Sequence, residues 1–351
     1  MKLADGIAQY RTPFLVGDCS SGAVTRLNNA ADCSREVAGC ALRFVLTDDL
    51  TGLCTALAYS RGARTLSCTD LLHVPAERVW VEWCTEPWRS ELERYGFAAD
   101  RLLLPAGRRG ALLRATPDGR RGTLRTFWSG ARADEVLASS VEAYFDLDAG
   151  EGEDPAPPDC DPRPAVRVFD GDRDLGADVL GRCFRFRYER SWSEYYARAG
   201  LAPRESAAVL RHALGTISID VPLLLAFFLL LATRSGLPRH VDRDRLNRSR
   251  TRLGRPPLLD HIEVRAPLLP EYPAGHAGGA GDGRRFPRLH HVRGHLVRRG
   301  SQLFWRVPHL RGSARAGSVR TRTVTWTFDP AVAARGEVRV KETPALRPAA
   351  C

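Results

Sequence analysis

The sequence predicts an α+β protein of two domains, with a mixed α/β domain over residues 1–147 and a basic domain over residues 165–351. Three observations predict this class. Strand-like alternation fills residues 284–328, an apolar run fills residues 221–232, and residues 148–164 between the halves are rich in proline, glycine and acid. A chain of 351 residues is long enough for two cores.

Short strand and helix patterns alternate along the first domain. Apolar residues in strand-like patterns predict strands at residues 41–46, 55–59 and 79–83, with a turn at Asp48-Asp49 between the first two. Residues 87–95 have the composition of a helix. We therefore expect this domain to combine both kinds of element.

A hairpin is expected at residues 111–128, where an Asp-Gly turn separates two apolar runs. Two acidic pairs, Asp48 with Asp49 and Glu82 with Glu86, stand elsewhere in this domain. No histidine or third carboxylate stands at a metal-ligand spacing from either pair. We interpret these four side chains as solvated carboxylates of a turn and of a helix start.

Residues 148–164 hold almost nothing to bury and are expected to link the domains. Residues 182–188 alternate arginine with aromatic residues, as a strand does. A helix is expected to begin at Asp220, with Pro222 just inside it. Its apolar run, residues 221–232, is shorter than the roughly 20 residues that a membrane span needs. We interpret it as a helix buried in the second domain, and we expect no membrane partner.

Six arginines follow the buried helix within residues 243–255. On a helix, Arg245, Arg248 and Arg252 have the spacing i, i+3 and i+7, which places them on one face. This face is expected to extend the positive surface of the second domain.

The remaining part of the second domain predicts a small antiparallel sheet. Histidine and arginine alternate with apolar residues over 291–297, as on a strand with one polar face. A turn at residues 299–302 and a second run at 304–311 predict a hairpin. A threonine-rich third run at residues 319–328 completes the sheet, which is expected to present arginine, histidine and Trp305 on one side.

Positive charge is concentrated in the second part of the chain. Residues 1–200 hold 26 basic and 30 acidic side chains, whereas residues 201–351 hold 26 and 11. Such asymmetry favours a polyanionic partner. Only Lys2 and Lys341 are lysines, so the arginines are also consistent with a GC-rich genome.

Nucleic acid, either DNA or RNA, is the partner that this surface favours, because guanidinium groups bind phosphates and an exposed tryptophan stacks on bases. No named DNA- or RNA-binding motif is present, so binding is expected to be independent of sequence. The expected contact residues are Arg245, Arg248, Arg252, Arg284, Arg285, Arg288, Arg293, Arg298, Arg299, Trp305, Arg306 and Arg311.

His291, His295 and His309 form a second candidate site. Three imidazoles are a ligand set for zinc, but Arg293 stands between two of them and disfavours a cation, so no metal is expected. A phosphodiesterase would use His295 or His309 as general acid or base, with Arg293 and Arg311 stabilising charge on phosphorus. No nucleophile is identified, and the P-loop, nucleophile-elbow, zinc-protease and dinucleotide motifs are missing. We therefore assign no catalytic residue and no cofactor, and an enzyme is the less favoured class.

A third class is an assembly or structural protein, in which the arginines would pair with acidic patches on protein partners. No feature indicates an oligomeric state. Nine cysteines without a C-x-x-C pair, and a beginning without the apolar core of a secretory signal, favour reduced thiols in a cytoplasm.

Three short motifs carry a resemblance to a known group. They are Asn247-x-x-Arg250-x-x-x-Gly254-Arg255-Pro256-Pro257-Leu258, His291-x-Arg293-Gly294-His295 and Pro308-His309-x-Arg311-Gly312. In them, residues 222–328 resemble uncharacterised proteins of prophages and phage-like elements of bacteria. The resemblance implies an origin in a mobile element and a bacterial cytoplasm. It brings no activity, fold or site assignment with it.

Overall fold

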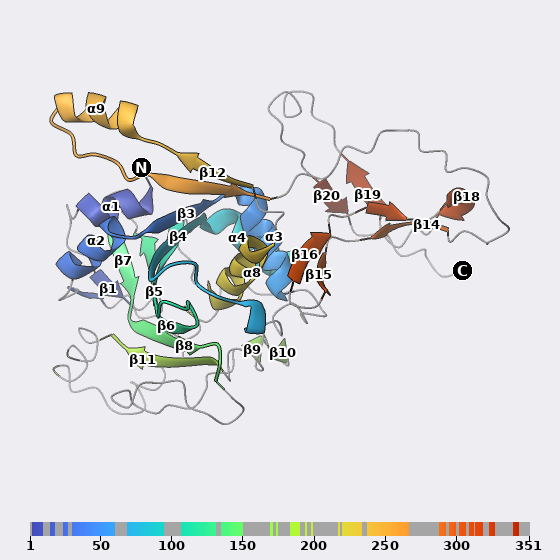
Figure 1. Ribbon diagram of the computed structural model, residues 1–351, viewed down its shortest axis with the longest axis horizontal. Helices are drawn as coiled ribbons and strands as arrows, with labels where there is room; N and C mark the ends of the chain where they lie inside the picture. The colour runs from blue at the N-terminus through green and yellow to red at the C-terminus, as the bar shows by residue number, and fades with distance from the viewer. Residues whose placement is uncertain are drawn as a thin grey trace. The chain divides into compact units, whose positions relative to one another are not determined.

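The protein is described here from a computed structural model (Figure 1). The structure describes residues 2–9, 15–17, 24–26, 30–59, 69–94, 107–130, 135–149, 169–170, 173–174, 183–189, 194, 198, 217, 220–233, 237–266, 288–292, 295–299, 302–306, 309–311, 313–318, 323–326 and 340–343. Contacts between residues divide the chain into one unit of residues 1–268 with 296–305, and a second unit of residues 269–295 with 306–351. The fold is α+β.

A mixed sheet of eleven strands is the centre of the first unit. Its main path runs in the order β12-β13-β3-β4-β5-β6-β7-β1-β2, and β8 pairs with both β6 and β11. The strands are β1 (Leu15–Gly17), β2 (Val24–Arg26), β3 (Leu42–Leu46), β4 (Arg78–Cys84), β5 (Arg108–Ala115), β6 (Arg121–Ser129), β7 (Val136–Ser139), β8 (Val141–Asp146), β11 (Phe184–Tyr188), β12 (Leu237–Val241) and β13 (His261–Arg265). The pairs β3 with β4, β13 with β3 and β1 with β7 are parallel, and the other pairs are antiparallel.

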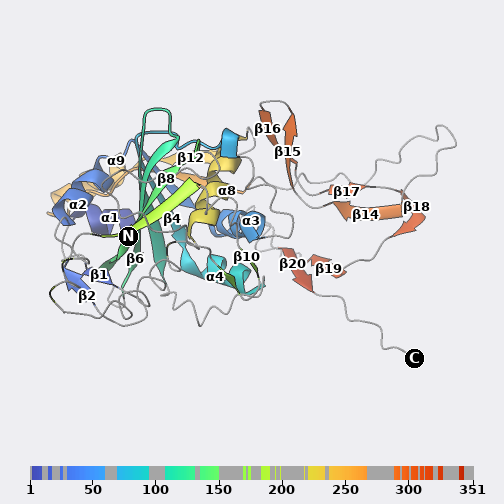
Figure 2. The same cartoon turned by 90° about the horizontal axis from the view of Figure 1, so that it is seen from below.

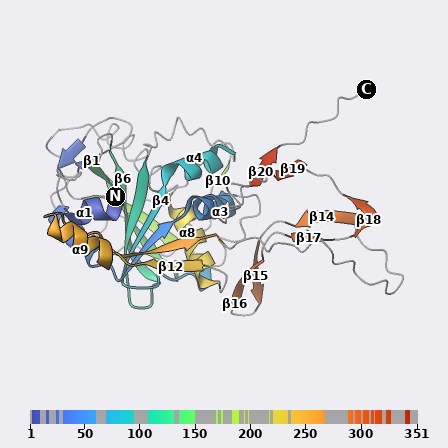
Figure 3. The same ribbon diagram turned by 90° about the horizontal axis from the view of Figure 1, so that it is seen from above.

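Helices cover both faces of this sheet, as Figures 2 and 3 show. The helices are α1 (Leu3–Gln9), α2 (Ala30–Ala38), α3 (Asp48–Tyr59), α4 (Thr85–Arg94), α8 (Asp220–Ala232) and α9 (Asp244–Arg252). Helices α1 and α2 pack together on one face, and α3 packs between α4 and α8 on the other. Helix α9 follows β12, the strand at the end of the sheet order.

Successive side chains of a strand point to opposite faces of the sheet, and in β4 both sets are buried. Each face therefore needs a cover. On the α1 and α2 side, the rings of Trp80 and Phe127 have centroids 5.7 Å apart. These two strand residues form one buried apolar cluster with side chains of α1 and α2. On the other side, Phe44 meets Phe227 of α8 at 5.4 Å. Helix α8 is buried on nearly all sides, as a wholly apolar helix should be. Its expected start at Asp220 is confirmed.

Several local expectations are confirmed by the strands and helices observed. They are the strands around residues 41–46 and 79–83, the helix at 87–95, the hairpin at 111–128, the strand at 182–188 and the helix that carries Arg245, Arg248 and Arg252.

The expected strand at residues 55–59, with a turn at Asp48-Asp49, is wrong, because these residues form α3. Acidic residues in the first turn suit the positive end of the helix dipole. Leu50, Cys54 and Leu57 are buried at helical spacing, so the segment packs one side against the core.

Strands from both sides of the expected linker join the same sheet. Residue Ile262 of β13 lies opposite Phe44 of β3, and Phe186 of β11 lies opposite Ala143 of β8. The division by contacts falls near residue 268, whereas the sequence placed the boundary at 147. Residues 150–164 of the expected linker lie outside the described residues.

Short strands form the described remainder. They are β9 (Phe169–Asp170) with β10 (Arg173–Asp174), β15 (His295–Arg299) with β16 (Gln302–Arg306), β19 (Thr323–Trp326) with β20 (Val340–Thr343), and β14 (Arg288–Val292) between β17 (His309–Arg311) and β18 (Ser313–Ser318). The pair β15 and β16 spans the turn expected at residues 299–302. His291 and His295 were expected on one strand but belong to β14 and β15, which are in different sheets. A glycine at position 294 disfavours a continuous strand there.

Candidate functional site

Helix α9 connects β12 and β13, the two paired strands at one edge of the sheet. Two backbone hydrogen bonds to carboxylates fix its beginning: Arg243 N donates to Asp260 Oδ1 at 2.8 Å, and Asp244 N donates to Asp242 Oδ1 at 2.7 Å. Acceptors at this end satisfy amides that have no partner inside the helix. The start of α9 is therefore fixed to the strand that follows it.

The inner side of α9 binds the loop that leads to β13. Asn247 Nδ2 donates to the carbonyl oxygen of Leu258 at 2.8 Å, and Asn247 Oδ1 accepts from the amide of Leu258 at 2.7 Å. One turn further on, Arg250 Nε donates to the carbonyl oxygen of Pro256 at 2.8 Å. These contacts attach helix and loop to each other along their length.

The end of α9 depends on Gly254, which has φ +64°. This left-handed conformation commonly follows a helix, and glycine adopts it without steric cost. The next amide, that of Arg255, donates back to the carbonyl oxygen of Arg250 at 2.8 Å. Asn247, Arg250 and Gly254, which belong to the first of the three sequence motifs, thus hold α9 in position.

The loop is in turn attached to helix α1. Leu259 N donates to Asp5 Oδ1 at 2.8 Å, and Gln9 Nε2 donates to the carbonyl oxygen of Pro257 at 3.3 Å. Asp5 is buried and also accepts from the amide of Lys2 at 3.1 Å. Helix α9 is therefore mounted on the α1 side of the sheet, as Figure 3 shows.

Helix α1 is anchored by Glu82 of β4, which is fully buried. The amides of Leu3 and Ala4 donate to its two carboxylate oxygens at 2.9 and 3.0 Å, Trp80 Nε1 donates at 3.2 Å, and Arg108 forms an ion pair with it. The interpretation of Glu82 as a solvated carboxylate is wrong. Four donors replace water, which is what allows the charge to be buried.

Three arginines occupy the outer side of α9. At 3.6 residues per turn, Arg245, Arg248 and Arg252 lie on the side opposite Asn247 and Arg250. All three are exposed, and within the described residues none of them forms an ion pair. Three exposed guanidinium groups on one helix side create a positive field that favours an anionic ligand, and Asp244 beside Arg248 offsets part of it. We call these three side chains the α9 arginine face.

The immediate surroundings of the α9 arginine face include apolar, polar and acidic groups. Leu246 is 43% exposed and Leu253 is 65% exposed, so two aliphatic side chains are open to solvent here. A shallow groove of about 550 Å³ runs along the helix and is lined by Asp244, Asn247, Arg248, Thr251 and Arg252. The surface can therefore contact anionic and aliphatic groups together.

An acidic cluster lies at the N-terminal end of α9. Carboxylate oxygens of Asp242, Asp244 and Asp260 lie within 4.8 Å of one another, an arrangement able to hold a cation. The amides of Arg243 and Asp244 already donate to two of these carboxylates. Two of the three carboxylates thus help to hold the backbone at the start of α9.

Further exposed basic residues flank this surface on either side. Arg239 and His240 are exposed on β12, and Arg255 is exposed after the helix. The periodicity of the sequence did not single out β12, because its short run contains a proline and few apolar residues. Arg265 is paired with Glu263 at 2.7 Å and is less available to a ligand.

The other expected contact residues are placed as follows. Arg288 is in β14, Arg298 and Arg299 in β15, Trp305 and Arg306 in β16, and Arg311 in β17, while Arg284, Arg285 and Arg293 lie outside the described residues. Arg299 and Arg306 are exposed.

The three histidines of the second candidate site occupy three strands, β14, β15 and β17. In the antiparallel pair of β14 with β17, His291 lies opposite Leu310, and His309 lies opposite Val292. The register therefore does not place His291 and His309 opposite each other.

A buried ion pair on the α8 side escaped the sequence reasoning. Arg109 Nη2 lies 2.7 Å from Asp220 Oδ2, and both side chains are fully buried. The guanidinium carbon lies 5.3 Å from the ring centre of Trp88 and 5.2 Å from that of Trp128, so the charge is held between two aromatic faces. Burial raises the pKa of Asp220 to about 6, and Arg109 opposes this rise. Both side chains are shielded from solvent, and the pair links β5 to the start of α8.

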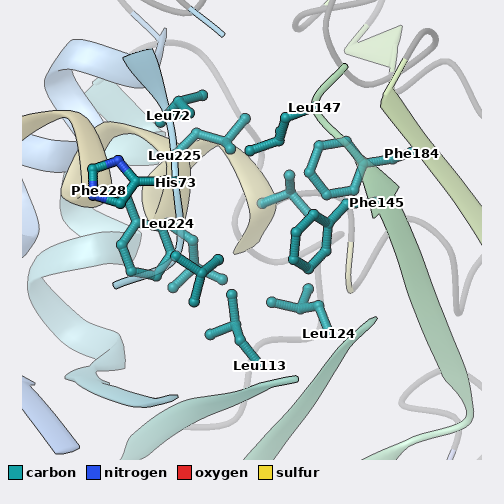
Figure 4. Close-up of a pocket in the computed structure, with 12 residues that line it drawn as sticks. Leu72, His73, Leu113, Leu124, Phe145, Leu147, Phe184, Leu224, Leu225 and Phe228 are labelled. Carbon is teal, nitrogen blue, oxygen red and sulfur yellow. The ribbon is translucent and has the colours of Figure 1, made fainter. Parts of the chain in front are cut away.

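An apolar cavity lies between α8 and the sheet (Figure 4). Its volume is about 20 Å³, enough for about one water molecule, and leucine and phenylalanine side chains from α8 and four strands line most of it. The cavity is a gap in core packing rather than a ligand site.

Comparison with protein families, curated proteins and solved structures finds no match to this chain. Within the described residues, no helix has the length and apolarity needed to cross a membrane.

Proposed function

We propose that the protein binds the phosphate backbone of nucleic acid, independently of the nucleotide sequence. In this proposal the α9 arginine face is a principal contact surface. The supporting observation is that Arg245, Arg248 and Arg252 are exposed on one side of a helix whose other side is bound to the following loop through Asn247 and Arg250. Arginine binds phosphate through planar, two-pronged hydrogen bonds. A rigidly held row of arginines therefore suits a chain of phosphates.

The proposal also covers the C-terminal part of the chain. A second contact surface would lie on β15, where Arg299 is exposed. The resemblance to proteins of phage-like elements supports a role in a mobile element within a bacterial cytoplasm. The motif residues Asn247 and Arg250 would then serve to hold the α9 arginine face in position.

A second candidate is an assembly protein that binds a protein partner through the same helix. The exposed Leu246 and Leu253 favour it, because adjacent arginine and apolar groups are typical of protein interfaces. A protein partner would require acidic groups opposite the arginines.

The test is a binding titration of the full chain with short fluorescently labelled nucleic acids, over a range of salt concentrations. The variant replaces Arg245, Arg248 and Arg252 with alanine. The matched control replaces Arg35, Arg94 and Arg121, which are also exposed but are paired with carboxylates elsewhere on the first unit. Both variants lose the same net charge.

We expect the wild type and the control to bind alike and the α9 variant to bind more weakly. On duplex DNA, the slope of log affinity against log salt should become shallower by roughly 0.9 for each phosphate that the variant no longer neutralises. Equal weakening in both variants would mean that only net charge matters. If nucleic acid does not bind and a stoichiometric protein complex is found instead, the second candidate replaces the first.

A further inference from the structure

We infer that the ligand of helix α9 is duplex DNA and that the helix lies along the major groove, with its arginines reaching the phosphates that border it. This inference rests on the function proposed above and names the class of nucleic acid. Four features of α9 support it.

The first feature is the way the helix is presented. No residue of α9 is buried, and its contacts with the rest of the first unit run along the side of Asn247 and Arg250. An α-helix with its side chains is about 10–12 Å wide, and the major groove of B-form DNA is about 12 Å wide. The outer half of α9 therefore has the dimensions that the groove admits.

The second feature is rigidity. The beginning of α9 is held through Arg243 and Asp260, its middle through Asn247 and Leu258, and its last turn through Arg250 and Pro256. Ordering a flexible segment on binding costs free energy, whereas a helix already held in place avoids that cost. A duplex is itself a stiff ligand with regularly spaced phosphates, which matches a fixed row of arginines.

The third feature is the distribution of charge. Asp242 precedes α9 and Asp244 begins it beside Arg245, whereas Arg248 and Arg252 continue the helix without further acidic residues and Arg255 follows it. The charge of Asp244 offsets that of Arg245 at the first turn, so phosphates would be attracted more strongly toward the last turn. The C-terminal half of α9, with the groove between Arg248 and Arg252, is therefore the part that approaches the phosphate wall.

The fourth feature is the chemistry of the apolar groups beside the arginines. The exposed side chains are those of Leu246 and Leu253, which are aliphatic. Aliphatic groups contact the methyl groups of thymine in the major groove, whereas binding of single strands relies on aromatic rings that stack on bases. Duplex RNA is disfavoured because its major groove is too deep and narrow for side chains to read.

The experiment measures binding of the full chain to three labelled ligands at matched salt: a duplex DNA, one of its single strands, and a duplex RNA of corresponding sequence. We expect the duplex DNA to bind about tenfold more tightly than the other two, which corresponds to about 1.4 kcal/mol. The variant with alanine at Arg245, Arg248 and Arg252 should lose this preference, and the Arg35, Arg94 and Arg121 control should keep it. Circular dichroism checks that all three proteins are folded alike.

A competition experiment then tests the groove. Methyl green, which occupies the major groove, should be displaced from duplex DNA by the wild type, and a minor-groove ligand should remain bound. Equal or tighter binding of single strands or duplex RNA, or displacement of the minor-groove ligand alone, would overturn the inference while leaving nucleic-acid binding in place. Failure to bind any of the three ligands would instead remove the proposed function.

Discussion

Asn247 and Leu258 exchange two hydrogen bonds, at 2.8 Å and 2.7 Å, and thereby close the loop after α9 onto the inner side of the helix. The amide group of asparagine imitates a backbone peptide here, since it donates to a carbonyl oxygen and accepts from an N–H at once. The position of the outer arginines depends on this pairing, because Arg250 supplies the only other described side-chain hydrogen bond from α9 to the loop of residues 254–258.

Replacing Asn247 with alanine should loosen α9 without removing any arginine. Two partly buried hydrogen bonds are removed, so we expect a destabilisation of about 1–3 kcal/mol. Amide hydrogen exchange in α9 should accelerate, and affinity for nucleic acid should fall. Urea unfolding and hydrogen exchange measure the two effects. Aspartate at this position keeps the acceptor and loses the donor, so an Asn247→Asp variant that behaves like wild type would contradict the role of the donor.

Replacing Gly254 with alanine tests the end of the helix. A Cβ at this position would meet no atom within 4 Å, so the cost comes from the left-handed backbone alone. We expect a destabilisation of about 1 kcal/mol. Asparagine tolerates this conformation better, so Gly254→Asn should cost less than Gly254→Ala in the same thermal unfolding measurement. Equal stability of all three proteins would rule out the conformational requirement.

The buried pair of Arg109 and Asp220 should give the stability a particular pH dependence. Burial raises the pKa of Asp220 from 3.8 to about 6, so the folded state holds this proton more tightly than the unfolded chain does. The contribution of this bound proton to the free energy of unfolding is complete below pH 3.8 and is lost as the pH rises through about 6. Relative to Asp220→Asn, the wild type should therefore lose stability over this interval. Denaturant titrations of both proteins measure the difference, and a wild type that instead gains stability over this interval would contradict the raised pKa.

Removing the charge of Asp244 should strengthen the binding of nucleic acid. Asp244 lines the groove beside Arg248 and would repel a phosphate held there. Asp244→Asn is expected to raise affinity a few-fold at low salt, with the gain shrinking as salt screens the repulsion. Binding titrations at two salt concentrations provide the measurement. An unchanged affinity at low salt would contradict the placement of a phosphate in the groove that Asp244 shares with Arg248.

Local patterns in the sequence predicted those elements whose own residues determine them. Helix α8 is apolar over residues 221–232, the hairpin at residues 111–128 has an Asp-Gly turn between two apolar runs, and α9 carries its arginines at helical spacing. Helix α3 was misread because a short apolar run suits either a strand or a helix, and its packing against α4 and α8 decides between them.

Pairings between distant residues were beyond such reasoning. Glu82 accepts hydrogen bonds from the amides of Leu3 and Ala4, which are 79 and 78 positions away in the sequence. Arg109 pairs with Asp220, which is 111 positions away. Each looks like an ordinary surface charge in its local context. At the candidate site, the sequence alone predicted that Arg245, Arg248 and Arg252 share one side of a helix. It did not predict that Asn247 binds Leu258, because that contact depends on how the loop after the helix folds back.

The parallel pairing of Ile262 with Phe44 has a consequence for synthesis on the ribosome. Strand β3 leaves the exit tunnel long before β13 does, so one side of it stays unpaired while the intervening residues are translated. Unpaired strand edges in partly folded chains are prone to associate with other chains. The nascent chain therefore carries an open edge at β3 until β13 has emerged, and the completed sheet covers that edge.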